Sequence, residues 1–167
     1  MTRLLRSSKL WLPNRALLLA ISISLAGVAL AQTAQKRPNA GTEDEPVFHD
    51  YRGVKLGWLA DDVRKKLGNP ANKSDEQDYY EFSDNEKASV YYDKATKQVT
   101  AISVDFIGTG NGVITPQQVF GAEIEAKSDG SKSRLVRYPK AGYWVSYSRT
   151  AGDNPIISVT MQKLPPQ

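Results

Sequence analysis

The sequence predicts an α+β protein in which two tandem repeats form one sheet, with short helices on one face. Each repeat is a helix followed by a three-stranded antiparallel meander. Three observations predict this arrangement. An amphipathic stretch with helix-terminating residues occupies positions 57–70. Three runs rich in β-branched and aromatic residues follow it, and strands favour that composition. The same order of elements then returns 55 to 56 residues later.

The stretch GWLADDVRKKLGNP (57–70) predicts a first helix of about two turns. Val63 and Leu67 are four residues apart and share one helix face. Acidic residues open the stretch and basic residues close it, which suits the helix dipole. Gly68 is a good C-terminal residue, and Pro70 prevents continuation. A helix this short has to be held by packing.

Three strands are predicted next, at DYYEF (78–82), ASVYY (88–92) and VTAISVDF (99–106). The polar sequences SDNEK and DKATK separate them as turns. In the third run, large apolar residues alternate with small or polar ones. This alternation predicts a sheet with one buried face and one open face.

The second half repeats this order after a glycine-rich joint, IGTGNG (107–112). Thr115, Pro116 and Gln118 form a capping-box pattern that predicts a second helix start. Val119 matches Val63 at an offset of 56 residues.

The remaining strands are predicted at RLVRY (134–138), GYWVSYS (142–148) and PIISVTM (155–161). The first of these matches DYYEF, so that Tyr138 corresponds to Phe82. We therefore expect one repeat at 47–110 and the other at 111–167. The alternative is that two unrelated helix-plus-sheet segments resemble each other by chance.

Residues 1–31 have the features of a secretory signal peptide. They carry four basic residues and no acid, then the apolar run ALLLAISISLAGVAL, and end in Ala29-Leu30-Ala31. We expect cleavage after Ala31 and a periplasmic or secreted protein. The alternative is an uncleaved membrane anchor, but the apolar run is shorter than the roughly 20 residues that span a bilayer. No membrane span is expected after cleavage.

Residues 32–46 are polar, contain Pro and Gly, and lack large apolar side chains. This composition predicts a flexible tether. The chain has 22 Lys and Arg against 18 Asp and Glu, and four of the basic residues belong to the expected leader. The mature chain is thus formally neutral, which gives no indication of a nucleic-acid partner. The chain has no cysteine, so neither a disulfide nor an acylated cysteine is expected.

Gly57, Val63 and the motif LGNP (67–70), followed by an aromatic strand and a V-T-A-I strand, resemble a known family. The family is that of the SmpA/OmlA (BamE-like) small outer-membrane assembly lipoproteins. The tandem arrangement is similar to that of the secreted beta-lactamase inhibitor proteins, and the resemblance covers residues 53–163. It implies a non-enzymatic fold whose open sheet face or edge loops contact other proteins.

No catalytic constellation is predicted, and we expect no enzyme activity. The lone histidine, His49, lies beside the polar tether, and a nucleophile elbow is absent. Glu81 and Asp105 share the expected open face as a carboxylate pair, but 18 acids make such a pairing easy by chance. The sequence GTGNG (108–112) lacks the Lys-Ser/Thr of a phosphate loop.

No metal or other cofactor is expected. Short-spaced His and Cys ligands are missing. The acidic stretches DEQD (75–78) and SDNE (83–86) lack the residue order of a calcium loop and are interpreted as turns.

Strand alternation places four large residues on the open face, Tyr79, Tyr91, Arg137 and Trp144. Tyr, Trp and Arg dominate interface hot spots, so these four are the candidate protein-binding residues. Two alternatives are open: cross-strand aromatic pairs also stabilise a sheet without any partner, and a register slip of one residue would turn Trp144 inward.

The leading hypothesis is an exported, non-catalytic protein-binding or cell-envelope scaffolding module whose partner is another envelope or secreted protein. The alternative is a small-ligand or cell-wall-fragment sensor that uses the cleft between the repeats. The sequence leaves the oligomeric state open.

Overall fold

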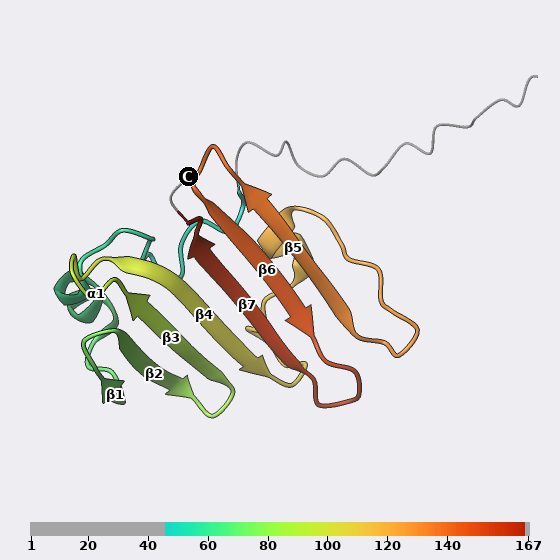
Figure 1. Ribbon diagram of the computed structural model, residues 1–167. Helices are drawn as coiled ribbons and strands as arrows, with labels where there is room; N and C mark the ends of the chain where they lie inside the picture. The colour runs from blue at the N-terminus through green and yellow to red at the C-terminus, as the bar shows by residue number, and fades with distance from the viewer. Residues whose placement is uncertain (1–45, 166–167) are drawn as a thin grey trace, which may run out of the picture. The chain divides into compact units, whose positions relative to one another are not determined.

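The computed structural model describes residues 46–165. These residues form one open antiparallel sheet of seven strands and two short helices (Figure 1). The prediction of a mixed fold with one antiparallel sheet and few short helices is therefore confirmed. The predicted signal peptide and all but the last residue of the predicted tether lie outside the described residues.

The six long strands overlap the six predicted runs, and both helices overlap the predicted helical stretches. In chain order the elements are α1 (Ala60–Leu67), β1 (Asn72–Lys73), β2 (Gln77–Ser83), β3 (Glu86–Tyr92), β4 (Val99–Ile107), α2 (Pro116–Phe120), β5 (Lys132–Tyr138), β6 (Tyr143–Arg149) and β7 (Ile156–Lys163).

The strand order across the sheet is β1-β2-β3-β4-β7-β6-β5, and every neighbouring pair is antiparallel. Consecutive strands of each half are joined by hairpins, as Figure 1 shows. The halves meet where β4 pairs with β7, with Val104 opposite Val159. We call this β4–β7 pair the central pair.

Strand pairing corrects one sequence match. Relative to the middle strands, Tyr138 stands opposite Tyr143, whereas the residue at the corresponding place in the first half is Tyr80, opposite Ala88. Tyr138 therefore corresponds to Tyr80 rather than to the predicted Phe82. The reason is hairpin length, because seven residues separate Tyr80 from Ala88 and only four separate Tyr138 from Tyr143.

The strand β1 was not predicted. Its two residues are polar and exposed, so they show no alternation. They pair with Tyr79 and Asp78 of β2, and this pairing is a tertiary contact that local propensity does not encode.

Alternate residues of the long strands build a single hydrophobic core. Val104 and Val159 of the central pair are 1% and 0% exposed. Val63 of α1 and Val119 of α2 are fully buried in the same cluster.

The two helices begin differently. Thr115 and Gln118 form the predicted capping box at α2, and Pro116 occupies its first turn. The first residue before α1 is Leu59, whose side chain makes no capping hydrogen bond. Gly68 ends α1 at φ 88°, a conformation that glycine adopts without steric cost.

Two adjacent isoleucines test the burial pattern, because Ile157 is 2% exposed and Ile156 is 46% exposed. Replacing Ile157 with Ala should lower the free energy of unfolding by about 2–5 kcal/mol, since it removes apolar contacts and leaves a cavity. The matched change Ile156→Ala should cost less than about 1 kcal/mol. Urea denaturation of both variants measures the difference, and equal losses would contradict the assigned faces.

Candidate protein-binding face

The side of the sheet turned away from the core, here called the open face, consists of three rows of side chains. Each row follows the pairing register across six strands. The first row contains Gln77, Tyr91, Ala101, Gln162, Trp144 and Arg137; the second contains Tyr79, Ser89, Ser103, Thr160, Ser146 and Leu135; the third contains Glu81, Lys87, Asp105, Ser158, Ser148 and Ser133.

The structure brings all four predicted residues onto this face. Tyr91, Trp144 and Arg137 lie in the first row, and Tyr79 lies in the second. Tyr91 and Arg137 are exposed, and Tyr79 and Trp144 are half-buried. Trp144 stands directly opposite Arg137. Tyr91 and Trp144 are three strand spacings apart, or about 14 Å.

Small polar side chains form the middle of the face, on the central pair. The hydroxyl oxygens of Ser103 and Thr160 lie 2.9 Å apart and share a hydrogen bond. In the third row, the Ser158 hydroxyl donates to the Asp105 carboxylate. The middle therefore satisfies its own polar groups and stands lower than the aromatic side chains on both flanks.

The two carboxylates of the possible glycosidase pair lie in the third row. Lys87 stands between Glu81 and Asp105 in the register, and its ammonium is 3.6 Å from Glu81 Oε1. The acids are two strand spacings apart, about 10 Å, with a cation between them. This arrangement is a charge ladder on an exposed sheet, where each pair contributes little stability.

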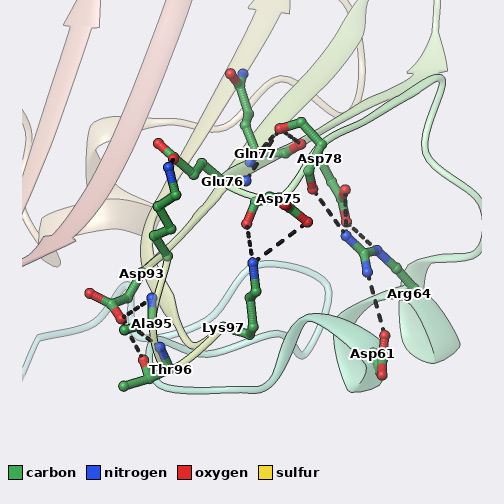
Figure 2. Close-up of polar contacts among 12 residues, drawn as sticks. Asp61, Arg64, Asp75, Glu76, Gln77, Asp78, Asp93, Ala95, Thr96 and Lys97 are labelled. Carbon is green, nitrogen blue, oxygen red and sulfur yellow. Dashed lines mark hydrogen bonds and ion pairs between the residues drawn. The ribbon is translucent and has the colours of Figure 1, made fainter.

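A buried charge cluster behind β2 was missed by the sequence reasoning (Figure 2). Asp78 is fully buried. Arg64 of α1 donates from Nε to Asp78 Oδ2 at 2.8 Å and from Nη2 to Oδ1 at 3.0 Å. The Tyr92 hydroxyl donates to Oδ2 at 2.8 Å. The paired geometry makes this contact stronger and more directional than a single ion pair.

The interpretation of Asp78 as the end of an acidic turn is wrong. Asp78 lies in β2 on the inner face, two residues before the buried Tyr80. An acid in phase with buried strand residues is the signal that could have revealed it, because a buried carboxylate requires a partner. The neighbouring acid Asp75 is exposed and pairs with Lys97 at 3.5 Å (Figure 2).

The cluster holds its protonation states far from neutral pH. Burial first, and then the hydrogen bond to Asp78, raise the pKa of the Tyr92 hydroxyl. The hydrogen bond to Asp78 raises the pKa of the Arg64 guanidinium. Tyr92 therefore remains a neutral donor and Arg64 a cation across the physiological range.

His49 borders a cavity of about 490 Å³ between segments of the two halves. Lys55, Tyr143 and Lys163 also line it. The His49 ring lies 3.0 Å from the Val47 carbonyl oxygen through Nδ1 and 3.2 Å from Asp50 Oδ2 through Nε2. The cavity lining contains no acid.

Within residues 46–165, no group of three or more His, Cys, Asp or Glu residues is placed to hold a metal ion. Neither helix in this part of the chain is long and apolar enough to cross a membrane. Comparisons with models of protein families, with curated proteins and with solved structures find no match to this chain.

Breaking the buried charge cluster should be costly. Arg64→Met leaves the Asp78 carboxylate buried without its cation, so the free energy of unfolding should fall by about 3–5 kcal/mol. The double variant Arg64→Met/Asp78→Leu removes both charges and should recover most of that loss. Urea denaturation at pH 7 measures both. A double variant no more stable than Arg64→Met would contradict the assignment of a buried, cation-dependent carboxylate.

Proposed function

We propose that this protein is an exported, non-catalytic protein-binding or cell-envelope scaffolding module, and that the open face is its docking surface. The observation that carries the proposal is the first row of that face. Tyr91, Trp144 and Arg137 stand in one row on either side of the small residues of the central pair.

The residue types support a protein partner. Tyr, Trp and Arg provide large contact areas at interfaces, and the low polar middle lets a convex surface approach the sheet. Arg137 forms no ion pair or hydrogen bond with another residue of the described chain, so its guanidinium is available to a partner acceptor.

The area of the face sets a limit. Its rows span five strand spacings, about 24 Å, and the three rows extend about 14 Å along the strands. That projection is roughly half of the approximately 800 Å² that each partner buries in a standard interface. A stable complex therefore needs the loops beside the first row, 93–98 and 139–142, as well as the face.

We also propose that the two halves are copies of one unit, with their helices on the same face. Val104 and Val159 are 55 residues apart and stand opposite each other in the central pair, as expected where two copies meet about a two-fold axis. Burial of Val63 and Val119 in one cluster supports the placement of both helices.

The expected export signal and neutral mature charge agree with an envelope partner rather than with nucleic acid. Part of the proposal thus depends on the sequence of residues 1–31, and part on the geometry of residues 46–165.

The face is tested with the mature chain as bait in an envelope extract. The unmodified chain should retain one stoichiometric protein partner, and Tyr91→Ala/Trp144→Ala should lose it with a melting temperature changed by less than about 4 °C, since both side chains lie outside the core. Leu59→Ala is the matched control, because Leu59 is 49% exposed but lies outside the open face. Retention of the partner by the double variant would refute this docking surface, and a large fall in melting temperature would assign the residues to stability.

The cavity beside His49 favours one second candidate, a sensor for a small ligand or a cell-wall fragment. Lys55 and Lys163 line it and form no ion pair with another described residue, so a carboxylate-bearing ligand would meet two ammonium groups. A thermal shift with cell-wall fragments that Lys55→Ala/Lys163→Ala removes, without a protein partner in the extract, would favour the sensor over the module.

A further inference from the structure

Strand β5 is an uncovered edge of the sheet. It has seven residues and pairs with β6 without a register shift. The opposite edge is protected, because β1 pairs with part of β2 and the β2–β3 register shifts between Glu81 and Ser83. No described residue forms a backbone hydrogen bond along the outer side of β5.

The direction of the β5 amides is set by the pattern of the whole sheet. Residues on one face of an antiparallel strand direct both backbone groups to the same neighbour. Leu164 N donates to Gly142 O and Thr150 N to Ile156 O, so even-numbered residues of β6 bond to β7. Odd-numbered residues of β6 therefore bond to β5, and their partners there are even-numbered.

The backbone groups of Ser133, Leu135 and Arg137 consequently point to the free edge. All three are exposed, and Leu135 is 55% exposed. They offer three N–H donors and three carbonyl acceptors with the spacing of a strand, which an extended chain can pair with.

The charge of the edge selects its partner. β5 carries Lys132, Arg134 and Arg137 and no acid. Lys132 is 3.7 Å from Glu123, while Arg134 lies over the Phe120 ring at 5.1 Å and Arg137 has no partner among the described residues. A second copy of β5 would double this positive charge, whereas an acidic strand would neutralise it.

We propose that β5 binds an extended acidic segment of a partner protein as an eighth strand. Alternate side chains of that segment would lie on the open face beside Leu135 and Arg137, which favours an apolar residue and an acid at those positions. The other side chains would lie beside Arg134. This site is distinct from the aromatic row, so it stands or fails separately from docking on the open face.

The probe is a blocked, fluorescein-labelled peptide of eight alternating Val and Glu residues, titrated by fluorescence anisotropy against the mature chain. Leu135→Pro removes an outward N–H at a position where an edge strand tolerates proline. Leu135→Ala is the matched control, since it removes the same side chain and keeps the N–H. Neither change touches Tyr91 or Trp144.

Saturable binding by the unmodified chain and by Leu135→Ala, at least tenfold weaker with Leu135→Pro, would support the added strand. No binding, or equal affinity for the two variants, would overturn it. If Leu135→Pro does not fold, the same peptide methylated on alternate backbone nitrogens is used with the unmodified chain, and undiminished binding would overturn the proposal.

Three further outcomes decide the occupant. A peptide of alternating Val and Lys that binds equally would exclude charge selection. Sedimentation that shows a dimer, dissociated by Leu135→Pro, would assign the edge to a second copy. A tenfold gain in peptide affinity after Glu43→Gln/Asp44→Asn/Glu45→Gln would assign it to the acidic segment of the chain itself. Each of these results overturns the assignment to an acidic partner.

Discussion

The structure depends on the central pair of strands. Each half of the described chain is roughly 55 residues, a size at which an isolated domain is marginal. Pairing β4 with β7 joins the two halves and leaves neither strand as an edge. Its inner side buries Val104 against the core, and its outer side hydrogen-bonds Ser103 to Thr160. Both sides of the pair are thus satisfied, one by apolar packing and the other by hydroxyl groups.

Because a single sheet supports both halves, each helix has only to cover part of one face. α2 achieves this with local signals, since its capping box satisfies the first free amides. α1 lacks a side-chain cap at Leu59. It is fixed by Val63 in the core and by the two-point contact of Arg64 with Asp78. The buried charge cluster therefore takes the place of a cap in orienting α1 on the sheet.

Strand alternation made the faces of the sheet predictable from the sequence. With a period of two, Tyr79 and Tyr91 had to share a face once their strands were identified, and the same argument placed Arg137 and Trp144. The Thr115 capping box was predictable for a similar reason, because its residues are close together in the chain.

Features made by distant residues were not predictable in this way. Asp78 looks like a turn acid until Arg64 and Tyr92 are seen around it. The β5 register depends on a hairpin of four residues, and an offset match does not detect a shortened hairpin. The cavity beside His49 joins His49 to Lys163, more than a hundred residues apart.

The two edges of the sheet show how the same constraint has opposite consequences. At β2, the short strand β1 and the irregular register remove much of the template for another chain. At β5, the register is regular and only charge distinguishes one incoming chain from another. Positive charge on an edge disfavours a second basic strand, yet it attracts an acidic one. Protection by charge is therefore selective, whereas protection by a covering strand is not, and this difference makes β5 the edge at which a partner can be recognised.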